Sequence, residues 1–381
     1  MPAKPRLYYW TEITPQQAYA SGIERVVRNL GAGLEEIGVD VVPVRWDAAR
    51  QAIGPLDQHL RERLTADHGP VGSTFDPATD VLSGAWLLIP EIPPAVMMAP
   101  EFNPVQIARA NGMRTAAMIY DIIPAKFPEL HSSGMVGVFR NYFASFSNTD
   151  LTIAPTAYVA NDLRVHLTAR ELSVPTIAVV ALAGEFIGAA RAHQAGPLVQ
   201  PTEALRLLAV GLWRPRKNYP QLLRALRCAR ERSPRAITLT IVGSPGAFPD
   251  LNAEVYALAA ELSDVHIKTS VTDAELAQLY AEHHATVFPS WEEGFGLPIV
   301  ESLWFGVPCI CHNGSAIAEV ARGGGTLMLD MLDEEALVQG LCRLSTDQRL
   351  WQQLACEARE RPTRTWRAYS EAILSTLLRA Q

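Results

Sequence analysis

Apolar residues follow two alternating patterns along the chain. Short runs in which nearly every residue is apolar, such as Arg6–Trp10 and 39–46, are typical of buried strands. Between these runs apolar residues recur at helical spacing, at Ile23, Val26, Val27, Leu30, Leu34 and Ile37. The alternation predicts an α/β fold, in which a parallel sheet carries helices on both faces.

The same two patterns predict the other elements. Further strands are expected within 85–92, 114–123, 151–155, 176–183, 205–213, 236–244, 265–270, 285–290, 307–313 and 325–330. Helices are expected at 101–111, 134–148, 157–168, 219–232, 251–262, 273–284 and from Trp366 to Leu378. Residues 184–204 lack a strong period and are rich in Gly, Pro and small residues, so we interpret them as a linker.

The chain length indicates two domains. A chain of 381 residues is long for a single hydrophobic core. We therefore expect one Rossmann-like, doubly wound domain at 1–190, a second at 201–362, and a helical segment at 363–381.

Composition excludes several classes of protein. A formal net charge of −7 gives no global electrostatic support to a nucleic-acid partner. The five cysteines lie in apolar or helical contexts without zinc-ligand spacing, so we interpret them as reduced core residues of a cytoplasmic protein. The first ten residues lack the apolar region of a signal peptide, and no run of about 18 apolar residues predicts a membrane span. Attachment to a membrane surface stays open.

The segment WEEGFGLPIVE (291–301) contains Glu293 and Glu301, eight residues apart, with a glycine loop between them. It follows a predicted buried strand, so the loop is expected at the carboxyl edge of the sheet, where ligands of open α/β sheets bind. Pro298 is expected at the first position of the next helix and Glu301 in its first turn, near the positive end of the dipole. Gly294 and Gly296 remove side chains beside the free N–H groups, so an anion or a sugar can approach. The alternative is that Glu301 only caps the helix.

The region around this segment resembles the E-x7-E signature of retaining GT-B glycosyltransferases of family four. Members of that family read E-G-F-G-L-P-x-x-E-A and then G-x-P-V-I. Glu293–Pro298, Glu301 and Gly306–Pro308 match this pattern, and Ala318–Val320 is similar to a following P-E-V element. The resemblance implies two Rossmann-like domains that face a cleft, with the C-terminal helix packed back on the first domain.

Two weaker matches extend the resemblance. VGLWRPRKN (210–218) is similar to the phosphate-binding strand and loop of the family, and SGIERVVRNL (21–30) is similar to its N-terminal glycine turn. The resemblance is strong in the C-terminal half of the chain and weak in the N-terminal half.

The resemblance also implies roles for the motif residues. Glu301 would accept hydrogen bonds from the ribose hydroxyls of the donor, and Glu293 would approach the donor sugar near its 3-hydroxyl and the reacting centre. The backbone N–H groups of Phe295, Gly296 and Leu297 would hold the sugar and the distal phosphate. Ionised carboxylates suit hydroxyl recognition because they only accept hydrogen bonds. The expected substrate is a nucleotide-diphosphate sugar, and no cofactor is expected.

The leaving nucleoside diphosphate needs a positive partner. No Asp-x-Asp triplet stands ahead of an apolar run to hold Mg²⁺, so we expect a metal-independent reaction in which Lys217 stabilises the growing charge on the β-phosphate. Arg216 or Arg214 would assist, and the sequence does not decide between them. The alternative is that these basic residues form a solvated turn before a helix.

The acceptor side is less defined. Relatives carry His-Asp at the end of a strand of the first domain, and this chain has Tyr120 and Asp121 there. Tyrosine is a poor general base at an ordinary pKa of about 10, although it can donate a hydrogen bond. Further candidates for the acceptor or donor sugar are Lys126 and His131 in the following loop.

Ser21 and Gly22 open the first long helix. Gly22 would free the helix N-terminus for a diphosphate or an acceptor oxygen. The alternative is that Ser21 is an ordinary N-cap.

The sequence as a whole predicts a retaining, metal-independent glycosyltransferase. From the resemblance we expect a saccharide or lipid-linked saccharide acceptor in polysaccharide, O-antigen or capsule assembly at the cytoplasmic face of the membrane. GDP-mannose is favoured as donor, with dTDP-rhamnose and UDP-sugars open, and the oligomeric state is not predicted. The alternatives are a non-catalytic nucleotide-sugar-binding protein and another GT-B enzyme such as a sugar-nucleotide epimerase. A dinucleotide-dependent oxidoreductase is disfavoured because no G-x-G-x-x-G follows the first strand.

Overall fold

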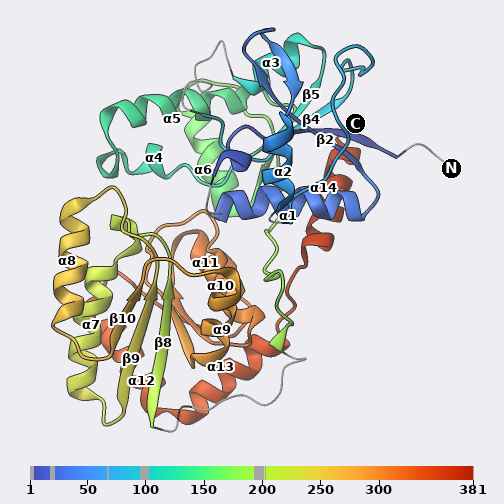
Figure 1. Cartoon of the computed structure of the whole chain (residues 1–381). Helices are drawn as coiled ribbons and strands as arrows, with labels where there is room; N and C mark the ends of the chain where they lie inside the picture. Colours follow the sequence, from blue (N-terminus) through green and yellow to red (C-terminus); the bar gives the residue numbers. More distant parts are fainter. Residues whose placement is uncertain are drawn as a thin grey trace. The chain divides into compact units, whose positions relative to one another are not determined.

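The computed structural model describes residues 4–17, 22–66, 68–94, 103–192, 201 and 203–380. The chain divides into two compact units (Figure 1). The N-terminal unit comprises Met1–Ala183 and Arg364–Gln381, and the C-terminal unit comprises Gly184–Thr363. Each unit has its own parallel sheet, so the predicted α/β fold class is confirmed.

The sheet of the N-terminal unit has the order β3-β2-β1-β4-β5-β6-β7 and is parallel except for the β2–β3 pair. Its strands are β1 (Arg6–Trp10), β2 (Asp40–Asp47), β3 (Ala52–Pro55), β4 (Trp86–Ile89), β5 (Arg114–Met118), β6 (Leu151–Ala154) and β7 (Thr176–Val179). Its helices are α1 (Gly22–Glu36), α2 (Gln58–Ala66), α3 (Pro104–Ala110), α4 (Ile123–Lys126), α5 (Ser133–Ser145), α6 (Ala157–Thr168) and α14 (Trp366–Arg379). The strand order reverses between β1 and β4.

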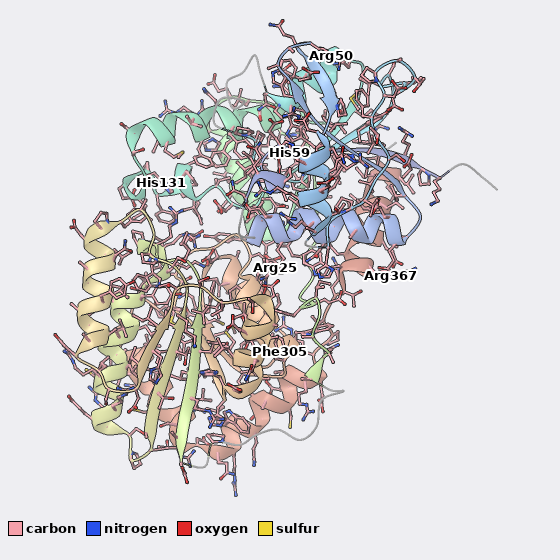
Figure 2. The ribbon with its side chains drawn as sticks, viewed as in Figure 1. Arg25, Arg50, His59, His131, Phe305 and Arg367 are labelled. Atoms are coloured by element: carbon pink, nitrogen blue, oxygen red, sulfur yellow. The ribbon has the colours of Figure 1, made fainter. Side chains whose placement is uncertain are left out.

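Helix α14 returns to the N-terminal unit and packs against α1 (Figure 1). Ser370 donates a hydrogen bond to the Leu30 carbonyl at 3.2 Å. Gly33 allows this close approach, because a Cβ there would lie 2.4 Å from the Ser370 hydroxyl. At the surface Arg367, labelled in Figure 2, forms an ion pair with Glu36 at 2.7 Å.

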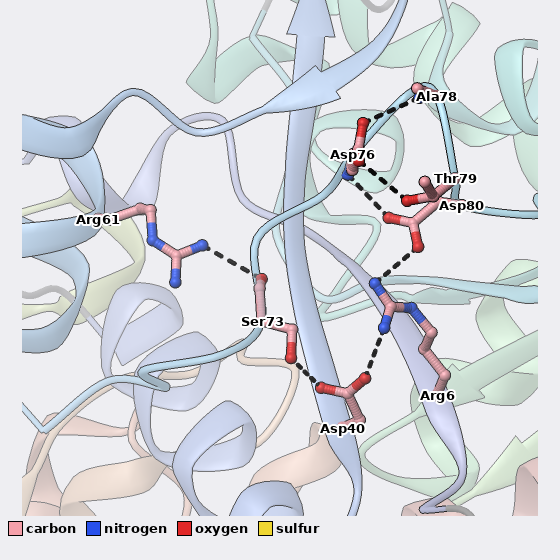
Figure 3. A network of polar contacts seen from close by, with 8 residues as sticks. All are labelled: Arg6, Asp40, Arg61, Ser73, Asp76, Ala78, Thr79 and Asp80. Carbon is pink, nitrogen blue, oxygen red and sulfur yellow. Dashed lines mark hydrogen bonds and ion pairs between the residues drawn. The ribbon is translucent and has the colours of Figure 1, made fainter.

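A network of ion pairs and hydrogen bonds lies at the amino edge of this sheet (Figure 3). Arg6 and Asp40 are the first residues of the paired strands β1 and β2, and they form an ion pair at 2.8 Å. Arg6 also pairs with Asp80 at 2.7 Å, and Ser73 donates to Asp40 at 2.5 Å. The network therefore holds Ser73 and Asp80, which lie between α2 and β4, at the edge opposite the carboxyl ends of the strands.

The sheet of the C-terminal unit is fully parallel, with the order β10-β9-β8-β11-β12-β13 and helices on both sides of its strands (Figure 1). Its strands are β8 (Ala204–Val210), β9 (Ala236–Val242), β10 (Val265–Lys268), β11 (Ala285–Phe288), β12 (Cys309–His312) and β13 (Thr326–Leu329). Its helices are α7 (Tyr219–Arg232), α8 (Pro249–Ala260), α9 (Asp273–Glu282), α10 (Leu297–Trp304), α11 (Ser315–Ala321), α12 (Glu334–Thr346) and α13 (Gln348–Glu360). The strand order reverses between β8 and β11.

The first unit ends at Ala183, whereas the sequence placed the end of the first domain at residue 190. The reason lies in Phe186, which is buried in the C-terminal unit against the rings of Tyr280 and Phe305. Residues 193–200 and 202 of the predicted linker lie outside the described residues.

The structure also corrects the interpretation of the cysteines. All five are free thiols, and Cys309 and Cys311 are buried in β12 as expected. Cys356 is instead exposed on α13, so the prediction of a core position was wrong for this residue.

Candidate functional site

The loops after β8 and β11 leave the C-terminal sheet on either side of the point where its strand order reverses. Ligands of open α/β sheets bind at such a point, outside the carboxyl ends of the strands. The loop after β8 contains a 3-10 turn, η7 (Pro215–Lys217), and the loop after β11 contains Glu293. The Trp291 N–H donates to the Arg216 carbonyl at 3.1 Å, which joins the two loops.

Glu293 meets two cations in this crevice. Its carboxylate lies 2.6 Å from the Lys217 ammonium and also forms an ion pair with Arg216. Arg216 further donates to the Glu292 carbonyl at 3.1 Å. The side chains of Lys217 and Glu293 are only 12% and 10% exposed, so the basic turn is not a solvated one.

Burial and the charge of the ion-pair partner have opposite effects on the pKa values of Glu293 and Lys217. Burial raises the pKa of Glu293, but Arg216 and Lys217 outweigh it and hold that pKa below its usual value. Burial lowers the pKa of Lys217, and Glu293 only partly offsets this effect. The Lys217 ammonium also lies 4.5 Å from the centroid of the Phe288 ring.

Arg214 lies apart from this pair. Its guanidinium is 5.7 Å from the centroid of the Phe248 ring, and burial lowers its pKa. Of the two arginines that the sequence left open, Arg216 is the one in contact with Glu293.

The glycine loop leads into α10 one residue earlier than expected. Gly296 has φ +103°, a value that L side chains rarely adopt, and it forms the N-cap. A Cβ on Gly296 would meet Ile299 at 3.0 Å, so this glycine is also needed for packing toward the protein interior. Because α10 begins at Leu297, Pro298 is its second residue and not its first.

Glu301 lies beyond the first turn of α10, so its predicted first-turn position was wrong. The Glu301 backbone already takes part in the helix, since its carbonyl accepts from the Phe305 N–H at 3.2 Å. Its buried carboxylate accepts a hydrogen bond from the Tyr280 hydroxyl at 2.9 Å. Tyr280 in turn stacks on Phe305, with ring centroids 5.1 Å apart. The Glu301 carboxylate therefore lies in contact with the Tyr280 hydroxyl, beyond the first turn of α10.

In the N-terminal unit, Tyr120 and Asp121 follow β5. Tyr120 donates a hydrogen bond to the Pro90 carbonyl at 2.5 Å, and burial raises its pKa well above the usual range. Asp121 accepts from the Ile123 N–H at 2.9 Å, at the start of α4.

The remaining candidates of this unit lie on separate elements. Lys126 forms an ion pair with Asp162 at 2.8 Å and contacts the Tyr158 hydroxyl at 2.6 Å. His131 lies between α4 and α5 (Figure 2). Gly22 is exposed and begins α1, whereas Ser21 lies outside the described residues.

Sequence reasoning missed Glu91, which follows β4 and is 1% exposed. Its carboxylate accepts four hydrogen bonds from Glu12, Ile13 and Thr14. The only signal in the sequence was an acidic residue directly after an apolar run, at the end of a predicted strand.

Two features of the described residues bear on metals and membranes. Within these ranges, no group of three or more His, Cys, Asp or Glu side chains is arranged to hold a metal ion. Nor does the described part of the chain contain a helix with the length and apolarity to cross a membrane.

The chain is similar to several known glycosyltransferases. The family model described as "Glycosyl transferases group 1" matches residues 204–347. Serotype-specific mannosyltransferase WbdA of Escherichia coli is 26% identical over 330 residues, which cover 81% of this chain and 38% of that protein. O-antigen chain mannosyltransferase B of Escherichia coli is 30% identical over 148 residues, 39% of this chain and 38% of that protein. The chain thus spans well under half the length of these relatives.

A solved structure matches along nearly the whole chain. HepE of Anabaena, crystallised with UDP and glucose, superimposes with a TM-score of 0.70 at 14% identity, covering 98% of this chain and 100% of the other. At this identity the likeness concerns the fold alone. Residues 204–347 therefore match the group 1 glycosyl transferase model, and the chain has the GT-B fold.

Proposed function

We propose that this protein transfers a sugar from a nucleotide-diphosphate donor to a saccharide or lipid-linked saccharide. The observation that carries the proposal is the contact of Lys217 and Arg216 with Glu293 at the carboxyl edge of the C-terminal sheet. Two cations beside a carboxylate suit a diphosphate next to a hydroxylated sugar. The experiment is a donor panel, scored by release of nucleoside diphosphate.

In the proposed reaction, the bond between the anomeric carbon and the β-phosphate oxygen breaks while the acceptor oxygen bonds to that carbon. The acceptor proton passes to the leaving phosphate on the same face, which retains the anomeric configuration. Lys217 and Arg216 stabilise the charge that grows on the phosphate. Glu293 faces the donor sugar, and the Phe295–Leu297 backbone binds the sugar and distal phosphate.

GDP-mannose is the donor we favour, because WbdA and O-antigen chain mannosyltransferase B are named as mannosyltransferases. Their names also support an acceptor in O-antigen or related polysaccharide assembly. The proposed place of action is the cytoplasmic face of the membrane, where a lipid-linked acceptor is available at the surface.

Replacing Glu301 by alanine is expected to weaken donor binding while the fold stays intact. Glu301 would accept the ribose hydroxyls, and loss of a charged hydrogen-bond partner costs on the order of 1.5–3 kcal/mol. Calorimetry with GDP-mannose should therefore show affinity lower by about 10- to 100-fold.

Tyr280→Phe is the matched control for Glu301→Ala. It removes the hydroxyl that donates to Glu301 but leaves the carboxylate in place. Donor affinity should change little in this variant. Equal affinities for the wild type and Glu301→Ala would remove Glu301 from the donor site.

Chelation is expected to leave the activity in place. Lys217 and Arg216 would supply the positive charge that a metal ion provides in other transferases. Rates with EDTA should match those without it. Loss of activity in EDTA that Mn²⁺ or Mg²⁺ restores would refute the metal-independent mechanism.

A non-catalytic nucleotide-sugar sensor is the second candidate function. It is favoured by Tyr120, which stands where relatives carry histidine and which donates its hydroxyl proton to Pro90. A sensor would bind the donor at equilibrium without ever consuming it, so the donor panel separates the two functions.

A further inference from the structure

The N-terminal sheet has its own reversal point, between β1 and β4. The loop after β1 includes Glu12–Thr14, and Glu91 lies two residues after Ile89, where β4 ends. The Glu91 carboxylate accepts from the Glu12 N–H, from the Ile13 N–H at 2.7 Å and from the Thr14 N–H at 2.9 Å. The Thr14 hydroxyl donates a fourth hydrogen bond at 2.7 Å.

The burial of the Glu91 carboxylate has a cost in folding free energy. Burial of a carboxylate is unfavourable unless hydrogen bonds compensate it. Burial raises the pKa of Glu91 to about 7, and the hydrogen bonds from Thr14, Ile13 and Glu12 act in the opposite direction. Three consecutive peptide N–H groups thus converge on one acid that lies 77 to 79 residues further along the chain.

Other buried groups hold the same loop. Arg28 is 3% exposed and donates to the Thr14 carbonyl at 3.2 Å. It also donates to the carbonyls of Arg63 and Leu64 near the end of α2, at 2.7 and 3.1 Å. The Thr14 residue is therefore fixed through its N–H, its hydroxyl and its carbonyl.

Tyr120 makes a further contact at the carboxyl edge of the same sheet. Its hydroxyl donates to the carbonyl of Pro90, the residue before Glu91. The ends of β5, β4 and β1 are linked in sequence through Tyr120, Pro90 and Glu91. This gives Tyr120 a structural role, which requires its hydroxyl to stay protonated and does not require it to act as a base.

Resting on the proposed function, we propose that Glu91 is a positioning residue that holds the Glu12–Thr14 backbone in the shape required to bind the saccharide acceptor. The loop lies at the reversal point of its sheet, where ligands of this sheet type bind. The exposed residues Gln16 and Gln17 follow in the same loop, and their amide groups match the hydroxyls of a sugar. The acceptor contacts the loop, and Glu91 acts through it.

Glu91→Gln tests this assignment with almost no change in side-chain size. The amide has one acceptor oxygen, and its NH2 group would face N–H donors, so part of the four-bond set is lost. Amide hydrogen exchange at Glu12, Ile13 and Thr14 should become faster. The acceptor probe is octyl α-D-mannoside with GDP-mannose as donor. Its KM should rise by about tenfold or more, since the loop is no longer preorganised.

A merely structural role for Glu91 would weaken donor binding and acceptor binding alike, so donor affinity is the second measurement. Affinity for GDP-mannose, measured by calorimetry, should stay within about twofold because its site lies in the other unit. Asp40→Asn is the matched control, since it makes the same acid-to-amide change at the opposite edge of the same sheet (Figure 3). This control should lower the melting temperature without changing the KM for the acceptor.

If Glu91→Gln fails to fold, Thr14→Val tests the same proposal. It removes only the hydroxyl bond to Glu91, so the acceptor KM should rise by about threefold. Thr14→Ser keeps that hydroxyl and should restore the wild-type value. Unchanged acceptor KM in Glu91→Gln, or in Thr14→Val where that variant replaces it, would overturn the proposal.

Failure of the proposed function can be recognised separately. A wild-type protein that consumes no donor in the panel would refute glycosyl transfer. The proposal about Glu91 would then be decided by exchange at Glu12–Thr14 and by calorimetric binding of the octyl mannoside. Unchanged exchange together with unchanged binding in Glu91→Gln would overturn it on its own.

Discussion

Lys217→Ala is expected to lower turnover by about 100-fold or more, by analogy with the loss of one preorganised donor to a developing oxyanion. The Lys217 ammonium is buried beside Glu293, at the edge of the sheet where the diphosphate is proposed to bind. Its attraction to the phosphate grows as the glycosidic bond breaks. The interaction is therefore stronger in the transition state than in the ground state, and its loss should reduce kcat as well as affinity.

Two further substitutions separate this role from a general effect of charge. Lys217→Arg should recover only part of the activity, because a planar guanidinium does not replace a compact ammonium. Arg214→Ala is the matched control, since Arg214 faces Phe248 and does not contact Glu293 in the way Arg216 does. Steady-state rates would be compared after circular dichroism confirms folding. A folded Lys217→Ala variant with near wild-type turnover would move the phosphate role to Arg216 or Arg214.

Glu293→Gln is expected to impair both activity and stability. The substitution keeps the shape of the side chain but leaves Lys217 and Arg216 without their buried anion. Removal of one partner from a buried ion pair costs about 3 kcal/mol or more. Turnover should also fall by about 100-fold, since Glu293 would face the donor sugar at the reacting centre.

The pH dependence distinguishes the ion pair from a packing effect. The folded protein holds the pKa of Glu293 below 4.5, so the ion pair stabilises it above that pH and the contribution is lost as pH falls through the lowered pKa. The difference in free energy of unfolding between the wild type and Glu293→Gln should be full at about pH 7 and shrink below about pH 4.5. Denaturant titrations at several pH values measure it. A difference that is constant across this range would contradict the ion-pair assignment.

Much of the fold could be read from local patterns. The strand Arg6–Trp10 and the helices 157–168 and 219–232 have the bounds that the periodicity predicts. Helices α12 and α13 and the strand β3 were not predicted. Strand β3 has only four residues and pairs antiparallel at the edge of the sheet, so its sequence carries little periodic signal.

Only part of the candidate site could be predicted from the sequence. The E-x7-E segment and the basic turn could be placed at one sheet edge, because both follow buried parallel strands. The start of α10 could not be placed to the residue, since it depends on the positive φ of Gly296 and not on Pro298. Glu301 was consequently assigned to the first turn, although Tyr280 and the ring of Phe305 determine its surroundings.

By itself, the sequence determined the two α/β sheets and the presence of a carboxylate loop and a basic turn at one edge of the second. These features are encoded locally, in runs of apolar residues and in motifs of a few positions. Only the tertiary structure decided that Arg216 and not Arg214 meets Glu293, and that Glu91 gathers the N–H groups of Glu12–Thr14. Both outcomes depend on contacts between residues more than 70 positions apart, and no local pattern specifies which buried groups such distant segments bring together.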